Sequence, residues 1–108
     1  MQLIQETYCL TEEFPKREIY GLIAQMRRAV ISIPANIAEG QERGTTKDFL
    51  RFLSISAGSL RELQTYLDVG LLLKYATEVQ IKAARELTEE IGRMLNGLRN
   101  ALHRRNAP

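Results

Sequence analysis

Apolar residues recur every three or four positions along most of the chain, a spacing that places side chains on one face of an α-helix. The three clearest series are Ile19, Leu22, Met26, Ala29, Ile33 and Ile37; Phe49, Leu53, Ser56, Leu60, Leu63 and Leu67; and Ala84, Leu87, Ile91, Met94, Leu98 and Leu102. No stretch alternates convincingly with a period of two, so no strand is expected. The pattern predicts an all-α protein whose long helices turn apolar seams towards a common core.

Capping residues set the boundaries of four predicted helices, at about 2–12, 16–42, 46–74 and 78–103. Thr45 with Asp48, and Thr77 with Gln80, have the spacing of capping boxes at the starts of the last two helices. Pro34 lies inside the second helix and is expected to kink that helix without ending it. Because the connections are short, the helices are expected to form an antiparallel up-and-down four-helix bundle, as a single domain over residues 1–108.

The first predicted helix is short, about 16 Å long, whereas the other three are each roughly 40 Å long. A bundle with one short helix leaves part of its groove uncovered. Either residues ahead of Met1 or a neighbouring subunit is expected to cover that gap.

The second and third helices carry more apolar surface than one bundle needs. Beside its seam, the second helix has a flank of Tyr20, Ala24, Ile31, Ala35 and Ala38, and the third has Leu50, Phe52, Ile55, Ala57 and Tyr66. Some of this surplus could simply be exposed, but burial against other subunits is the favoured interpretation. The predicted oligomer interface consists of Tyr20, Ile31, Leu50, Phe52, Ile55 and Tyr66.

Composition agrees with a small globular protein. The chain has 108 residues, of which 44% are hydrophobic and 26% charged, and a net charge of +2 that is too small to indicate a polyanion partner by itself. Cys9 is the only cysteine, which excludes an intramolecular disulfide, and it is expected to fill space in the core. Without a signal-peptide pattern or a membrane-length apolar run, a cytoplasmic protein with no membrane partner is expected.

The chain lacks the residues that most enzymatic reactions require. There is one histidine, His103, and no paired Glu-x-x-His, haem-attachment motif or glycine-rich phosphate loop. Ser59, His103 and Asp68 could be written down as a catalytic triad, but nothing orients them. We therefore expect no catalytic residue, no metal site and no cofactor.

A polar stripe follows the second helix beside its apolar seam, with matching groups on the third. Its members are Gln25, Arg28, Ser32, Asn36, Glu39 and Arg43, joined by Ser59 and Glu62. The favoured interpretation is a hydrogen-bond network between the two helices, in which Asn36, Glu39 and Arg43 join Ser59 or Glu62. A solvated face and a groove for a ligand or partner are the alternatives.

Basic residues gather at the C-terminal end of the chain. No acidic residue follows Glu90, whereas Arg93, Arg99, Arg104 and Arg105 all do. These cations could serve only to stabilise a helix C-terminus. They could also form a patch that binds nucleic-acid phosphates, which repetition in an oligomer would strengthen.

Four segments resemble a known family. They are QMRRAVISIPANIAEG (25–40), FLRFL (49–53), GSLREL (58–63) and the upstream FPxxExYGL (14–22). Together they strongly resemble the four-helix bundle family also called 23S rRNA-intervening sequence proteins, over nearly the whole chain. The resemblance implies an antiparallel bundle that assembles into homopentamers, in a family with no established reaction. Its members usually carry a further stretch ahead of the point where this sequence starts.

Two functions follow as expectations. The first is a non-catalytic, homo-oligomeric scaffold or adaptor that binds a protein partner. The alternative is an oligomer that binds RNA or DNA through the basic C-terminal residues. A more distant resemblance, to the pentameric accessory protein of diversity-generating retroelements, is compatible with either, since that protein binds a reverse transcriptase and nucleic acid.

Overall fold

The computed structural model describes residues 1–106, so Ala107 and Pro108 of the predicted domain lie outside it. The four helices are α1 (Gln2–Glu12), α2 (Leu22–Glu42), α3 (Thr46–Leu72) and α4 (Glu78–Asn106), with a short 3-10 helix, η1 (Lys16–Glu18), between α1 and α2. No strand occurs within this range. The all-α class and the short first helix are confirmed.

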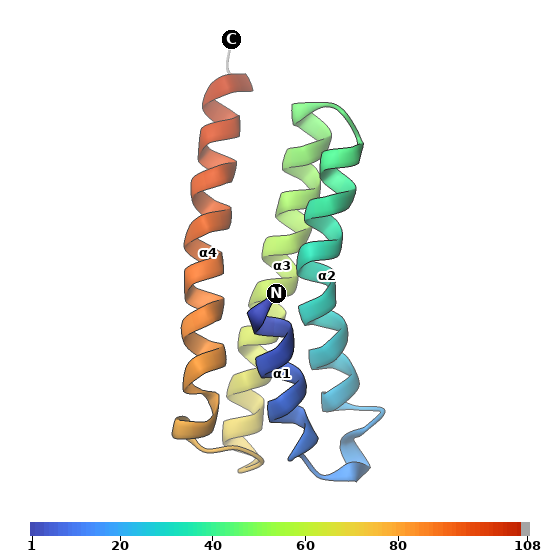
Figure 1. Ribbon diagram of the computed structural model, residues 1–108, viewed down its shortest axis with the longest axis vertical. Helices are drawn as coiled ribbons and strands as arrows, with labels where there is room; N and C mark the ends of the chain where they lie inside the picture. The colour runs from blue at the N-terminus through green and yellow to red at the C-terminus, as the bar shows by residue number, and fades with distance from the viewer. Residues whose placement is uncertain (107–108) are drawn as a thin grey trace.

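The helices alternate in direction and neighbour one another in chain order (Figure 1). α1 packs against α2 and α4, and α3 packs against the other flanks of the same two helices. Within residues 1–106, α2 and α4 lie diagonally and make no backbone contact, and neither do α1 and α3. The bundle is 51 Å long and 24 by 20 Å across, and α1 covers only its lower half (Figure 1).

The predicted seams supply the centre of the core. Met26, Ile33, Leu53 and Leu63 are fully buried, and Leu3 of α1 is buried with them. Each seam repeats at the helical period, so one face of every helix can point inward along its whole length. α2 continues through Pro34 as predicted, since the helix does not end until Glu42.

Both predicted capping boxes form hydrogen bonds. Thr45 Oγ1 accepts from the backbone N–H of Asp48 at 3.1 Å. The second box is reciprocal: the N–H of Thr77 donates to Gln80 Oε1 at 2.9 Å, and the N–H of Gln80 donates to Thr77 Oγ1 at 3.2 Å. These bonds satisfy N–H groups that have no partner within the first turn of a helix.

The second helix begins six residues later than predicted, at Leu22 and not at position 16. Gly21 is its N-cap, with non-helical φ and ψ of −108° and −113°. The carboxylate of Glu18, in the preceding 3-10 turn, accepts from the Leu22 N–H at 3.4 Å. Ile19 therefore lies outside the helix and 46% exposed, and its placement in the seam is wrong.

The third and fourth helices also differ at their ends. α3 stops at Leu72, and Lys74, predicted to be helical, has a left-handed φ of 62°. Such a conformation is uncommon for residues other than glycine and ends the helix by turning the chain away. α4 continues beyond its predicted end at His103 to Asn106.

Three further predicted core residues are exposed. Met94 and Leu98 belong to the seam of α4 but are 65% and 39% exposed, because α1 does not extend far enough to cover them. Cys9 is exposed on α1, where Leu3, Thr7 and Leu10 occupy the inward face. No helix within the described residues has both the length and the apolarity to cross a membrane.

Candidate interaction surfaces

Hydroxyl and amide side chains form a small hydrogen-bonded cluster where α2 meets α3. Ser32 Oγ and Ser59 Oγ lie 2.8 Å apart across the two helices. Asn36 Nδ2 donates to the Ser32 carbonyl and to Ser32 Oγ, both at 2.8 Å. Deeper in the core, Ser56 Oγ donates to the Ile33 carbonyl at 2.9 Å. These bonds fix the position of α2 against α3, because buried hydroxyls are costly without partners.

The prediction that Glu39 and Arg43 join Ser59 or Glu62 is corrected by the structure. Glu39 and Arg43 form an ion pair with each other along α2, with Oε1 and Nη2 2.9 Å apart and both side chains about half exposed. At this level α3 presents Phe52, and the Arg43 guanidinium carbon lies 5.1 Å from the centre of its ring. The Glu39 carboxylate and the Arg43 guanidinium therefore pair with each other and not with a polar group of α3.

The remaining members of the predicted network also pair within one helix. Arg28 donates to Gln25, one turn away on α2. The Tyr66 hydroxyl donates to Glu62 Oε2 on α3 at 3.4 Å, a long and weak contact. Exposed pairs at this spacing contribute a few tenths of a kcal/mol each. The interhelical network thus consists of Ser32, Asn36 and Ser59, with Ser56 as an addition that the sequence did not assign to it.

Two residues of the predicted oligomer interface, Leu50 and Phe52, are buried within the chain itself at 9% exposure. Phe52 packs so closely on Gly40 of α2 that a Cβ atom added there would lie 2.8 Å from its own Cβ. Its ring is flanked by the guanidinium groups of Arg43 and Arg51. α3 contacts α2 on one flank and α4 on the other, so part of its wide apolar arc is used inside the bundle.

The other predicted interface residues reach the surface. Tyr20 is 93% exposed, and Ile31 of α2 and Ile55 of α3 are each 43% exposed. Tyr66 is half-buried. On α2, the exposed residues near Ile31 include the small apolar Ala24, Ala35 and Ala38, and Arg28 one turn away. The outer face of α2 and the adjacent edge of α3 therefore remain an apolar surface, though a smaller one than the sequence predicted.

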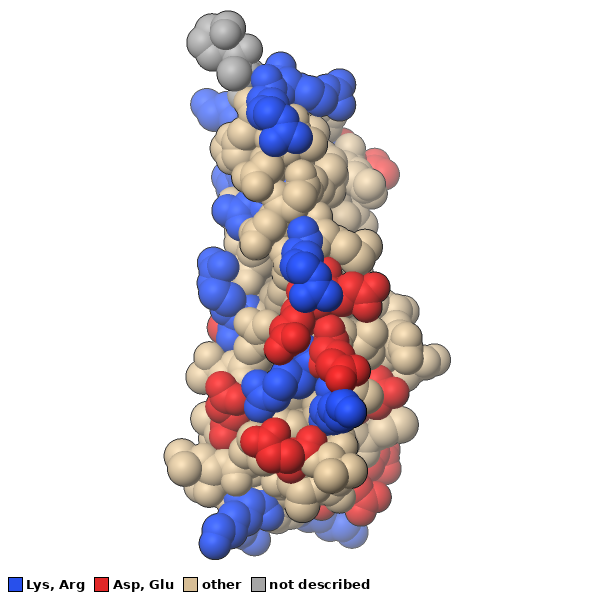
Figure 2. All heavy atoms as spheres, turned by 90° about the vertical axis from the view of Figure 1, so that its left-hand side faces the viewer, with Lys and Arg blue, Asp and Glu red and all other residues tan. Residues whose placement is uncertain are grey.

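The four arginines of the predicted basic patch lie on the upper half of α4. Figure 2 shows the side of the molecule where α4 lies, with Lys and Arg side chains at the upper end and most acidic side chains in the lower half. Arg93, Arg104 and Arg105 are exposed, and Arg99 is half-buried. The only ion pairs within residues 1–106 are Arg43–Glu39 and Arg85–Asp68, so none of these four arginines has a carboxylate partner there.

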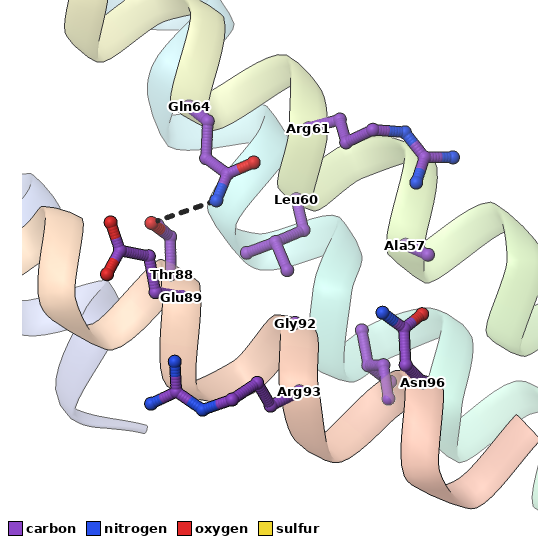
Figure 3. A pocket seen from close by; sticks show the side chains of 10 residues that line it. Ala57, Leu60, Arg61, Gln64, Thr88, Glu89, Gly92, Arg93 and Asn96 are labelled. Atoms are coloured by element: carbon purple, nitrogen blue, oxygen red, sulfur yellow. Dashed lines mark hydrogen bonds between the residues drawn. The ribbon is translucent and has the colours of Figure 1, made fainter.

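A cleft of about 430 Å³ lies between α3 and α4, and the sequence did not point to it (Figure 3). Arg61 and Gln64 line it from α3, and Arg93 and Asn96 line it from α4. Gln64 Nε2 donates across the cleft to Thr88 Oγ1 at 3.2 Å. Residues 57, 61, 64 and 68 of α3 are three or four apart, and this spacing could have indicated a shared polar flank.

A second polar contact joins the loops at the lower end of the bundle. The Tyr75 hydroxyl donates to Glu18 Oε2 at 2.7 Å. This bond, and then the N–H of Leu22, lowers the pKa of Glu18 below its usual value. The same bond raises the pKa of Tyr75, because removing its proton would place two negative charges side by side.

The three residues considered for a catalytic triad do not bond to one another. Ser59 bonds to Ser32, Asp68 pairs with Arg85 at 2.9 Å, and His103 lies exposed near the end of α4. Within residues 1–106, no three His, Cys, Asp or Glu side chains are grouped closely enough to hold a metal ion.

Comparison with known proteins assigns the family. The family model described as 23S rRNA-intervening sequence protein matches residues 1–97. No curated protein matches the chain. The matched range contains α1, α2, α3 and most of α4, including the Ser32–Asn36–Ser59 cluster and the cleft between α3 and α4. The chain therefore belongs to the 23S rRNA-intervening sequence protein family.

Proposed function

We propose that this protein is a non-catalytic, homo-oligomeric scaffold or adaptor whose subunits meet through the outer face of α2 and the adjacent edge of α3. The observation that carries the proposal is the pair Ile31 and Ile55, each 43% exposed on neighbouring helices. Exposed Ala24, Ala35 and Ala38 add apolar area and leave room for a helix of another subunit to approach. The family resemblance supports five subunits in a closed ring.

Static light scattering on the full chain tests the assembly. The wild type is expected to have the mass of five subunits, and Ile31→Asp or Ile55→Asp is expected to lower that mass, because a carboxylate cannot be buried unpaired in an interface. Both residues are exposed enough in one chain for the variants to keep their helical circular dichroism. Phe52→Asp is unsuitable, since it would disrupt the chain's own core.

Val79→Asp is the matched control. It makes the same chemical change at a side chain that is 84% exposed in the first turn of α4, away from the proposed interface. The control is expected to keep the mass of the wild type. A wild type that is monomeric at micromolar concentration would contradict the proposal.

Binding of RNA or DNA through Arg93, Arg99, Arg104 and Arg105 is the second candidate function. It is favoured by the concentration of exposed cations at the upper end of α4 (Figure 2). In a cyclic assembly every copy of this helix end points the same way, so the patch would become a ring of positive charge. Binding should weaken steeply with salt, since phosphate contacts release counterions.

Retention of RNA at about 50 mM salt, where counterion release favours binding, tests this candidate. Replacing Arg99, Arg104 and Arg105 by Gln should abolish most of the binding and leave the oligomeric state unchanged. If binding of a protein partner is insensitive to salt and no nucleic acid is retained, the scaffold proposal stands alone.

A further inference from the structure

Helical spacing traces the flank of α4 that lines the cleft towards the upper end of the bundle. On α4, Arg85 and Thr88 bond across to α3, and Gly92 and Asn96 line the cleft. Steps of three and four residues from these positions lead to Arg99 and His103, which therefore share the flank that faces α3. The opposing flank of α3 runs from Asp68 through Gln64 and Arg61 to Ala57, by the same spacing.

Charge is distributed unevenly along this flank. Below the Gln64–Thr88 hydrogen bond, Asp68 neutralises Arg85. Above it, Glu89 lines the lower edge of the cleft, and beyond Glu90 no acidic residue follows along α4. We define the basic groove by Arg61, Arg93, Asn96, Arg99 and His103. Figure 2 shows Lys and Arg side chains spread over the upper half of the side on which α4 lies.

Small and buried residues make the groove open without making it apolar. Gly92 contributes no side chain, and a Cβ atom there would meet only Leu60 Cδ2, at 3.5 Å. Leu60 and Leu95 form the floor but are themselves 3% and 4% exposed. A partner helix would find no apolar side chain to anchor it, whereas an anion would find guanidinium groups that lack carboxylate partners within residues 1–106.

The arrangement of the arginines suits a series of linked phosphates better than a single phosphate. In Figure 3 the guanidinium groups of Arg61 and Arg93 extend in opposite directions along the cleft, so they cannot clamp a single phosphate between them. From Thr88 to His103 this flank of α4 is about 22 Å long at 1.5 Å per residue. Arg61, Arg93 and Arg99 are distributed along the groove, an arrangement suited to successive phosphates of an extended strand.

We infer that the basic groove binds the phosphodiester backbone of a single nucleic-acid strand. The inference rests on the second candidate function and moves its main contacts from the tip of α4 to the wall that α4 shares with α3. Arginine donates two parallel hydrogen bonds to one phosphate, and the Asn96 amide can bond to phosphate or sugar oxygens. No aromatic side chain lines the cleft, so bases are not stacked there and binding is independent of sequence.

Fluorescence anisotropy with a short labelled single-stranded RNA of mixed sequence tests the inference on the full chain. At about 50 mM salt, Arg61→Gln and Arg93→Gln should each raise the Kd about tenfold, since each removes a charge-assisted hydrogen bond to phosphate. The slope of log Kd against log salt should become shallower by about 0.7 for each phosphate that the variant no longer neutralises. Lys82→Gln, an equal charge change on the exposed lower part of α4, is the matched control and should leave the Kd unchanged.

Each remaining outcome has a definite meaning. If the wild type binds and only replacement of Arg104 and Arg105 weakens binding, the groove is overturned while the second candidate function survives. If the wild type does not bind at about 50 mM salt, both are overturned. Poly-glutamate and unlabelled RNA are compared as competitors at equal total charge. If both displace the labelled RNA equally well, the groove binds any polyanion, and its assignment to a nucleic-acid strand is overturned.

Discussion

At the scale of single residues, the least satisfied polar group in the core is the hydroxyl of Thr7. Thr7 is fully buried on α1, and its Oγ1 has no hydrogen-bond partner among residues 1–106. One turn later, Thr11 is also buried but well connected: its Oγ1 donates to the Thr7 carbonyl at 2.9 Å and accepts from Arg27 Nε at 3.0 Å. Thr7 and Thr11 are both buried on α1, but only the hydroxyl of Thr11 has hydrogen-bond partners.

Replacing Thr7 by Val should stabilise the protein. The change removes a hydroxyl whose desolvation is not compensated, a cost of about 1–3 kcal/mol, and keeps the shape and nearly the helix propensity of the side chain. The free energy of unfolding in urea should rise by about 1 kcal/mol. Thr11→Val is the control and should lower that free energy, because it leaves Arg27 without its acceptor. Destabilisation by Thr7→Val would indicate that the hydroxyl has a partner after all.

At the scale of helices, Gly40 of α2 and Gly58 of α3 have opposite roles. At Gly40 of α2, an added Cβ atom would lie 2.8 Å from Phe52 Cβ and 3.0 Å from Phe49 Cδ1. At Gly58 of α3, an added Cβ atom would meet nothing within 4 Å. The close approach of α2 to α3 thus depends on Gly40. Gly58 has no such role and only increases the conformational entropy that the chain loses on folding.

Gly40→Ala and Gly58→Ala should shift stability in opposite directions. Alanine favours a helix by about 1 kcal/mol relative to glycine, so Gly58→Ala should raise the free energy of unfolding by up to that amount. At Gly40 the same gain is outweighed by overpacking, which costs about 1–3 kcal/mol and pushes Phe52 away from α2. Urea unfolding of both variants, compared with the wild type, measures the difference. Equal stabilisation by the two changes would mean that α2 and α3 can separate freely.

Much of each helix could be predicted because its signals are local. The capping boxes at Thr45 and Thr77 join residues three apart in the chain, and the hydrophobic seams repeat every turn. The start of α2 was misplaced because a capping carboxylate at Glu18 and the non-helical Gly21 act together, which no periodic pattern reveals.

Contacts between helices were predictable only in part. Of the polar stripe on α2, Ser32 bonds to Ser59 of α3, whereas Asn36 bonds to Ser32 on its own helix. The stripe could not show that Glu39 would pair with Arg43. The burial of Phe52 depends on how closely Gly40 allows α3 to approach, which is a property of the packed pair and of neither helix alone.

At the scale of the whole molecule, the lower end of the bundle is held together by its loops. Glu18 of η1 accepts hydrogen bonds both from Tyr75, in the loop between α3 and α4, and from the first turn of α2. The Phe14 ring packs against the Tyr75 ring with centres 5.5 Å apart, and the Arg17 guanidinium carbon lies 5.8 Å from the centre of the Tyr75 ring. These contacts connect the start of α2 to the start of α4, two helices whose backbones make no direct contact within residues 1–106.

Stability should depend on pH through this pair. Glu18 has a lowered pKa in the folded state, so its contribution is complete above its unfolded pKa and is lost as the pH falls through the folded value. Tyr75 has a raised pKa, so its contribution is complete below about pH 10 and is lost as the pH rises through the folded value. The loops should therefore be joined most firmly between these limits.

Thermal melts of Tyr75→Phe test this dependence. The difference in Tm between wild type and variant should be largest near neutral pH and should shrink as the solution is acidified through the pKa of Glu18. Tyr66→Phe is the control, because its hydroxyl makes only a 3.4 Å contact with the exposed Glu62 and should show little effect at any pH. A difference that stays constant across acidic pH would mean that the ring of Tyr75, and not its hydroxyl, supports the loops.

The short first helix also divides α4 into two parts that should open at different rates. Below the level of Met1, α4 is held by both α1 and α3, whereas above it only α3 contacts the helix (Figure 1). Local unfolding is easiest where few buried contacts oppose it. Backbone amides near Ile81 and Ala84 should therefore exchange with deuterium slowly, and those beyond Leu98 quickly. A nucleic-acid strand lying along the α3 side would slow exchange in the upper part alone, so one exchange profile would show whether that wall is occupied.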